Sequence, residues 1–181
     1  DLVGVLRRGM PGSAMPPWEW MSAGDLASLA ATVRALAIDG RTADLLRMAA
    51  EDEEEMTREE ALDIATSAMT PGAPVAIPPE CSSEGDLAEG RGLFVVSCAQ
   101  CHGPDGTGRG GTAEQFNEDG TPASPRNFTA GIFKGGAEHA DIVLRLLIGL
   151  PGSSMPATSF EDPRQASQVA AYVRSLVKPG A

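Results

Sequence analysis

The stretch Cys98-Ala99-Gln100-Cys101-His102 carries the most information in this sequence. Two cysteines separated by two residues and followed directly by a histidine are typical of a c-type haem attachment site. Cys98 and Cys101 can each form a thioether with a vinyl group of the porphyrin. His102 is then held beneath the ring, where its imidazole can ligate the iron. We therefore predict one covalently bound haem c at these residues.

A Cys-x-x-Cys pair also occurs in zinc sites and in redox-active disulfides. A structural zinc site takes about four protein ligands, and outside the motif the chain offers only Cys81 and His139. We expect His139 to be exposed in a polar loop and Cys81 to be an incidental free thiol, although a link from Cys81 to another group stays open. A redox pair needs no adjacent histidine, so haem explains more of the sequence.

An electron-transfer haem needs a second axial ligand, which is commonly methionine. Of the seven methionines, only Met155 follows His102. It lies in the segment 149–156, whose glycines and prolines predict a loop, and Pro151 and Pro156 would stiffen that loop around the thioether. We therefore predict that Met155 ligates the iron, in preference to the core-filling role that methionine often has.

The helices expected around the motif resemble those of class I c-type cytochromes. Segment 90–97 is similar to the N-terminal helix of that family, with Gly90 and Phe94 at the positions that pack on the last helix. Segment 167–176 is similar to the C-terminal helix, with Tyr172 as its aromatic residue. Its apolar residues recur at helical spacing, and the small Ala170 would let the glycine of the partner helix approach closely.

The resemblance covers residues 84–181 and implies an all-α cytochrome c fold around the haem. It also implies that the free ring N–H of His102 donates to a backbone carbonyl in a proline-containing loop after the motif, for which Pro125 is the candidate. Arg126 could pair with a haem propionate, and a plain surface role is the equal alternative. The glycine-rich segment 103–111 is expected to be a loop.

An internal repeat reveals a second domain-like element. Residues 1–36 match residues 141–176 at a constant offset of 140 positions, and Met15 falls where Met155 lies. Residues 1–40 are therefore predicted to be the C-terminal half of a first cytochrome c-like domain that lacks its own Cys-x-x-Cys-His. Residues 41–83 form an acidic helical insert and a Pro-rich linker, with a predicted helix at 42–50 and a capping box at Thr57–Glu60.

Three explanations of the half-domain stay open: the chain is a fragment, another polypeptide completes the domain, or the domain has lost its haem. The start within an expected helix favours the first two, in which Met15 would ligate a second haem whose attachment motif lies outside this chain. The expected helix 22–36 has one apolar face, formed by Leu26, Leu29, Ala30, Val33 and Leu36. We expect that face to be covered by a haem-bearing fragment, another chain or the haem domain, because monomers rarely expose such patches.

Charge and hydropathy limit the partners. The net charge is −11, and most of it lies in residues 1–81, which hold 14 acidic and 6 basic residues. Phosphates would repel this chain, so nucleic acid is disfavoured. The acidic run Glu51–Glu55 is a solvated face or a surface that steers the chain to a basic redox partner. No apolar run is long enough to span a membrane.

These observations favour one-electron transfer, by a free carrier or by an electron-transfer subunit of a larger oxidoreductase. The alternative is a dihaem peroxidase-like enzyme, but such an enzyme needs an open iron position and Met155 would fill it. Family resemblance implies a periplasmic or otherwise extracytoplasmic location in a bacterium. The electron donor, the acceptor and the reduction potential stay open.

Overall fold

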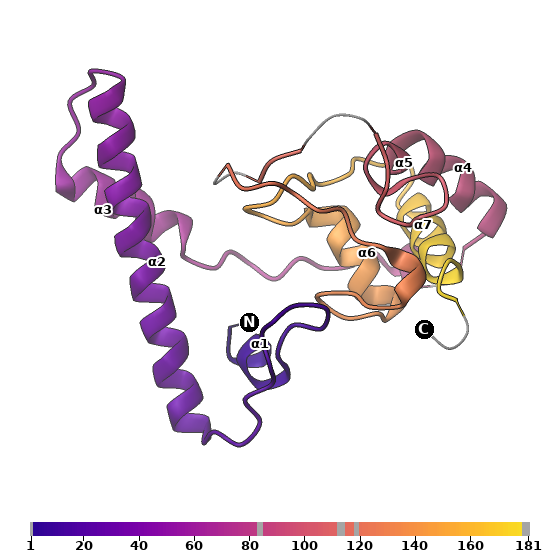
Figure 1. Cartoon of the computed structure of the whole chain (residues 1–181), viewed down its shortest axis with the longest axis horizontal. Helices are drawn as coiled ribbons and strands as arrows, with labels where there is room; N and C mark the ends of the chain where they lie inside the picture. Colours follow the sequence, from indigo (N-terminus) through magenta and orange to yellow (C-terminus); the bar gives the residue numbers. More distant parts are fainter. Residues whose placement is uncertain (1, 83–84, 112–114, 118–119, 179–181) are drawn as a thin grey trace. The chain divides into compact units, whose positions relative to one another are not determined.

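The computed structural model describes residues 2–82, 85–111, 115–117 and 120–178, and the predicted all-α fold is confirmed (Figure 1). Within the described residues, the only extended pairing is an isolated bridge between Phe116 and Pro122. The chain forms two compact units, residues 1–10 with 14–74 and residues 11–13 with 75–181. The division between 74 and 75 falls inside the predicted Pro-rich linker.

The predicted domain boundaries meet this division only in part. The expected boundary between residues 40 and 41 lies inside one continuous helix, α2 (Ala23–Glu51), so the half-domain and the acidic insert share that helix. The boundary between residues 83 and 84, and Asp1 at the start of the repeat, lie outside the described residues.

The second unit contains the helices around the motif. These are α4 (Leu87–Ser97), α5 (Ala99–His102), α6 (His139–Ile148) and α7 (Arg164–Ser175), with the 3-10 turns η1 (Pro79–Ser82) and η2 (Phe128–Ala130). Helices α4 and α6 both pack on α7. Their apolar faces form one core, whose fully buried residues include Phe94, Val143 and Val169.

Helices α4 and α7 cross closely at Gly90. A Cβ at this position would overlap the backbone carbonyl of Gln168 and lie 3.1 Å from the Cβ of Tyr172. Phe94, one turn further along α4, packs on Tyr172 with ring centroids 5.2 Å apart. The predicted pairing of Gly90 and Phe94 with the last helix is therefore confirmed. The expected partner of the glycine was wrong, because the closest atoms to Gly90 belong to Gln168 and Tyr172 and not to Ala170.

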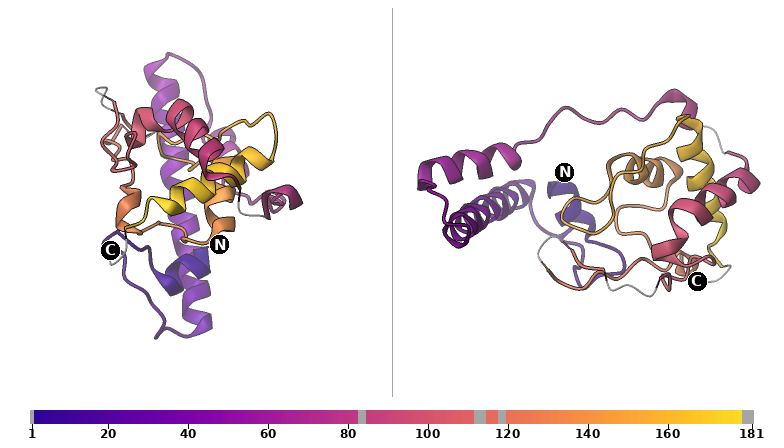
Figure 2. Two further views of the ribbon diagram at one scale, coloured as in Figure 1. Left: turned by 90° about the vertical axis from the view of Figure 1, so that its right-hand side faces the viewer. Right: turned by 90° about the horizontal axis from the view of Figure 1, so that it is seen from above.

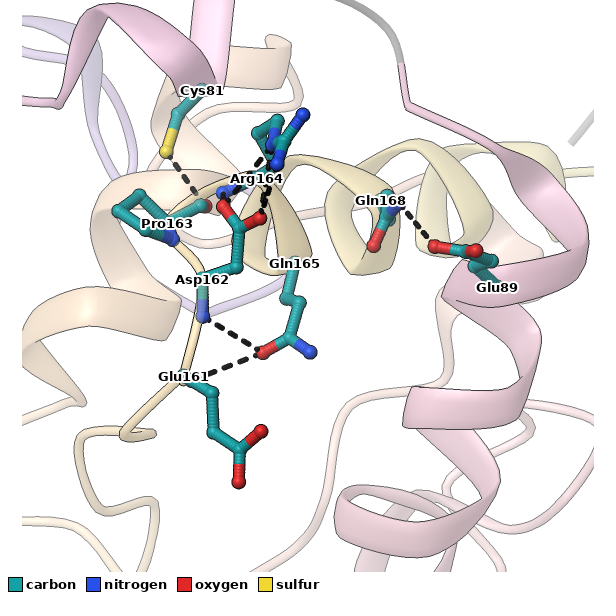
Figure 3. Close-up of polar contacts among 8 residues, drawn as sticks. All are labelled: Cys81, Glu89, Glu161, Asp162, Pro163, Arg164, Gln165 and Gln168. Carbon is teal, nitrogen blue, oxygen red and sulfur yellow. Dashed lines mark hydrogen bonds and ion pairs between the residues drawn. The ribbon is translucent and has the colours of Figure 1, made fainter.

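Polar contacts fix the start of α7 (Figure 3). The thiol of Cys81 donates to the carbonyl of Pro163 at 3.0 Å, and the amide of Gln168 donates to the Glu89 carboxylate at 2.6 Å. The Asp162 carboxylate accepts a hydrogen bond from the backbone N–H of Arg164 and pairs with its guanidinium. The Cys81 bond joins the start of α7 to η1, the Gln168 bond joins α7 to α4, and the Asp162–Arg164 contacts are local to the first turn of α7.

His139 is half-buried, so its predicted solvent exposure was wrong. Its Nε2 lies 3.1 Å from the Cys81 carbonyl and 2.9 Å from the Ser167 hydroxyl. The residue begins α6, and the packing of α6 on α7 directs the ring inward, which the polar sequence around it did not indicate. Cys81 is a free thiol and only 1% exposed.

The first unit consists of α1 (Leu2–Arg8), α2 and α3 (Arg58–Ala68). Helix α3 lies along the last part of α2 (Figures 1 and 2). Small residues make this close packing possible, since the buried positions are Thr42, Ala49, Ala61 and Ala65. The predicted helix at 42–50 is the end of α2, and the capping box is confirmed, because Thr57 and Glu60 bond reciprocally.

The sequence repeat is also a structural repeat. Gly9 and Gly149 both have a φ of 69°, and a Cβ at either would lie 2.8 Å from the carbonyl oxygen of the methionine six residues later. Two backbone hydrogen bonds recur at equivalent places. The N–H of Met10 donates to the Met15 carbonyl at 3.2 Å, and that of Leu150 donates to the Met155 carbonyl at 3.0 Å. Likewise the N–H of Trp18 donates to the Leu6 carbonyl at 3.1 Å, and that of Thr158 donates to the Leu146 carbonyl at 2.8 Å. Residues 2–18 thus fold as residues 142–158 do.

The crossing at Gly90 gives a direct stability test. Gly90→Ala should destabilise the protein by about 1–3 kcal/mol, the usual cost of overpacking a close contact. Gly92→Ala is the matched control, since nothing lies within 4 Å of a Cβ there and alanine favours a helix by up to about 1 kcal/mol. Chemical denaturation of both variants measures the difference. Equal stabilities would contradict the crossing.

Candidate haem-binding site

The motif forms a single tight turn at the end of α4. The carbonyl of Cys98 accepts hydrogen bonds from the backbone N–H groups of Cys101 at 3.1 Å and of His102 at 2.9 Å. Residues three apart lie on the same side of such a turn, so both thiols can reach one ligand. Both cysteines are half-buried and free.

The Cys98 thiol lacks the lowered pKa of a redox-active cysteine. Burial, aided by the neighbouring Cys101, raises the pKa of the Cys98 thiol to about 11, whereas redox-active cysteines have a lowered pKa. In the described part of the chain, no three His, Cys, Asp or Glu side chains gather as a metal ion such as zinc would need. Neither alternative use of the motif is therefore supported.

The imidazole of His102 has the tautomer and the protonation state that metal binding requires. Its Nδ1 lies 3.1 Å from the backbone carbonyl of Arg126. A carbonyl only accepts, so Nδ1 carries the proton and the lone pair of Nε2 is left for a metal. Burial lowers the pKa of His102 and favours the neutral ring. The ring also stacks on Phe128, with centroids 4.4 Å apart.

The predicted carbonyl acceptor, Pro125, was wrong by one residue. The bond goes to Arg126, while the carbonyl of Pro125 faces Gly108 and would lie 2.5 Å from a Cβ there. Successive carbonyls of an extended segment point in different directions, and only one can face His102. Arg126 thus contributes its backbone, and its pairing with a propionate stays a prediction.

The glycine-rich loop wraps the motif without forming a helix, as predicted. The backbone N–H of Gly108 donates to the His102 carbonyl at 2.8 Å, and that of Gly110 donates to the Cys101 carbonyl at 3.1 Å. A Cβ on Gly110 would overlap the carbonyl of Gln100. Glycine is therefore required for this close approach.

The loop of Met155 is held by its own hydrogen bonds. Besides the bond from Leu150 to the Met155 carbonyl, the backbone N–H of Met155 donates to the Ser153 hydroxyl at 3.2 Å, and that hydroxyl donates to the Leu150 carbonyl at 2.7 Å. Met155 and Cys98 are both partly buried against the same apolar core. The structure therefore brings the two ends of the predicted site to one cluster.

Gln115 joins the two ends and was missed in the sequence. Its amide nitrogen bonds to the sulfur of Cys101 at 2.7 Å, and its amide oxygen accepts from the Ser154 hydroxyl at 3.4 Å. Ser154 is the residue before Met155. A glutamine in an irregular segment carries no sequence pattern that would identify it, so only the tertiary structure reveals this contact.

The donor set fits haem c. It consists of two free thiols one turn apart, a neutral histidine with a fixed tautomer and a thioether in a rigid loop, all beside an apolar core. Bound haem would be held by Cys98 and Cys101, and His102 and Met155 are the candidate iron ligands.

Comparison with known proteins agrees. Residues 87–177 match the cytochrome c family model, so the chain belongs to the cytochrome c family, whose domains bind haem c covalently and transfer electrons. A solved chain of the "Kuenenia stuttgartiensis reducing HAO-like protein complex Kustc0457/Kustc0458" is similar at 26% sequence identity and a TM-score of 0.70, over 98% of this chain and 71% of that chain. No curated protein matches.

Covalent attachment can be tested with two cysteine substitutions. The purified protein should give a c-type pyridine haemochrome spectrum and keep its haem in denaturing gels. Cys101→Ala should remove one thioether and change the haemochrome spectrum. Cys81→Ala is the matched control and should keep the parental spectrum, even if loss of the buried thiol lowers stability. An unaltered spectrum in Cys101→Ala would contradict the assignment.

Proposed function

We propose that this protein is a one-electron carrier, or the electron-transfer subunit of a larger oxidoreductase, with haem c held at Cys98 and Cys101 and ligated by His102 and Met155. The observation that carries the proposal is that Met155, Cys98 and Phe128 border one apolar core and that the neutral ring of His102 stacks on Phe128. The bound haem supplies the chemistry, in which iron alternates between the ferrous and ferric states.

The chain's own residues set the conditions for this transfer. The Arg126 carbonyl fixes the tautomer of His102 and increases its basicity. The hydrogen bonds around Ser153 hold the backbone of Met155 in its loop. Phe94, Phe128 and their neighbours surround the site with apolar atoms, which excludes water and favours the less charged, reduced iron.

The peroxidase-like alternative is less well supported. Such an enzyme needs an iron position that is open to substrate, and Met155, whose loop is held by hydrogen bonds, is the residue proposed to occupy that position. A non-enzymatic role therefore agrees better with the site.

The partners and the location follow from charge and family. We propose that the acidic surface of residues 1–81 steers the chain to a redox protein with a basic docking surface.

In the described part of the chain, no helix has the length and hydropathy of a membrane span. Covalent haem attachment in this family supports an extracytoplasmic, periplasmic location. The similar solved chain is part of a protein complex, which supports the subunit role.

We also propose that Met15 ligates a second haem, whose Cys-x-x-Cys-His lies outside residues 1–181. The support is the structural repeat, in which the Met15 loop has the same backbone hydrogen bonds and the same glycine conformation as the Met155 loop. Met15 is also half-buried, and it packs against a small core of Leu6, Leu26 and Ala30. The protein would then be a tandem, dihaem cytochrome.

Substitution of Met155 tests the first ligand. Met155→Ala should remove the long-wavelength absorption band of methionine-bound ferric iron and allow carbon monoxide to bind. It should also lower the reduction potential by a few tenths of a volt, within the roughly 0.8 V that axial ligands span. Met48→Ala is the control, since Met48 is 46% exposed on α2, and should behave as the parent does. If Met155→Ala keeps the band and the potential, another group is the ligand.

The second ligand has its own test. In preparations that contain both haems, proton NMR of the reduced protein should show two strongly upfield-shifted methyl resonances from iron-bound methionines. Met15→Ala should remove one of them and Met155→Ala the other. A spectrum that Met15→Ala leaves unchanged would refute the role of Met15 and leave that of Met155 intact.

A further inference from the structure

One face of the N-terminal half of α2 corresponds, in the sequence repeat, to the face of α7 that packs on another helix. We define the crossing face as Ser28, Leu29, Thr32, Val33 and Leu36. At the repeat offset of 140 residues, these positions correspond to Gln168, Val169, Tyr172, Val173 and Leu176. Of that set, Gln168 and Tyr172 meet α4, Leu176 at the end of α7 meets the glycine-rich loop after the motif, and Val169 and Val173 lie in the buried core.

The contacts of α7 show what such a face binds. Gln168 and Tyr172 meet α4 at Gly90, and a Cβ at Gly106 of the glycine loop would lie 2.6 Å from the Leu176 side chain. The ring of Tyr172 packs on that of Phe94. The partner of this face is thus a helix that leads directly into the haem-attachment motif, together with the loop that follows the motif.

Most of the equivalent face of α2 is exposed in the described part of the chain, and of its residues only Leu29 is half-buried, against the cluster of Leu6, Leu26 and Ala30. Val173 is 4% exposed, whereas Val33 is 39% exposed and Leu36 is 66% exposed. The first turns of the same helix are packed, since Leu26 and Ala30 are buried against α1 and the Met15 loop. The exposed residues continue that buried cluster along the helix, so one half of a packed interface is present.

From this contrast we infer that the crossing face binds a haem-bearing helix of the α4 kind, which ends in Cys-x-x-Cys-His and comes from outside residues 1–181. This inference rests on the proposed second haem at Met15. The α4 helix of this chain cannot be the occupant, because α7 already covers it and the sequence contains one such motif.

Residue size at the crossing also fits this occupant. Ser28 and Thr32 replace the larger Gln168 and Tyr172, so α2 offers room for a bulkier partner helix.

A photo-cross-linking experiment tests the inference. Leu36→Cys places a thiol at the edge of the crossing face. This thiol is the one that a maleimide can label, because Cys81 is 1% exposed and haem occupies Cys98 and Cys101. The full chain, with its haem, is labelled with a benzophenone maleimide, mixed with periplasmic extract of the source organism and illuminated. We expect a cross-linked peptide that carries haem on a Cys-x-x-Cys-His absent from residues 1–181.

Two more variants make the result specific. Val33→Asp in the Leu36→Cys background should abolish the cross-link, because the carboxylate would be buried in the contact. Ala31→Asp is the matched control on the opposite side of α2 and should leave the cross-link intact. Cross-links to residues 75–178, to a second copy or to a haem-free protein, or no cross-link at all, would overturn the inference.

The same samples separate this inference from the proposed function. The absorption band and the potential of the haem at Cys98 and Cys101 report on the second unit, and the substitutions lie in α2 of the first unit. If that haem shows Met155 ligation and no haem-peptide cross-link forms, the docking surface alone is refuted. If that haem shows no Met155 ligation, the proposed function is refuted.

Discussion

The close crossing of α4 over α7 is the constraint on which the haem-binding unit depends. Gly90 lets the two backbones meet at Gln168, and Phe94 then packs on Tyr172. Because α4 runs directly into the Cys98 turn, this contact determines where the thiols and His102 lie. Helix α6, which leads into the Met155 loop, packs on the same α7. One helix therefore positions both sides of the site.

The two units of the chain share one helix arrangement, which is complete in the second unit and only partly present in the first. In the second unit, α7 is covered by α4 and α6 together. In the first unit, α2 is covered by α1 and the Met15 loop on one side only, and α2 then extends to Glu51, where α3 packs on it.

Much of this structure could be predicted from local sequence patterns. The haem motif, the capping box at Thr57 and the repeat of residues 1–36 depend on residue types at fixed spacing. The structure contains the capping box as reciprocal hydrogen bonds and the repeat, over residues 2–18, as shared backbone geometry. What failed was decided by tertiary contacts. The sequence does not reveal that the Arg126 carbonyl, and not that of Pro125, faces His102, or that α6 turns His139 inward. Gln115 was missed for the same reason, because its partners lie in distant segments. The repeat of residues 1–36 did not reveal the continuity of α2, which accommodates Gly40 although glycine disfavours helices.

The central claim is that His102 and Met155 ligate one haem iron. X-ray absorption at the iron edge of the purified chain tests it most directly, because sulfur and nitrogen neighbours scatter differently. The account predicts one sulfur neighbour in addition to the porphyrin and imidazole nitrogens. A shell of nitrogen or oxygen neighbours alone would contradict it.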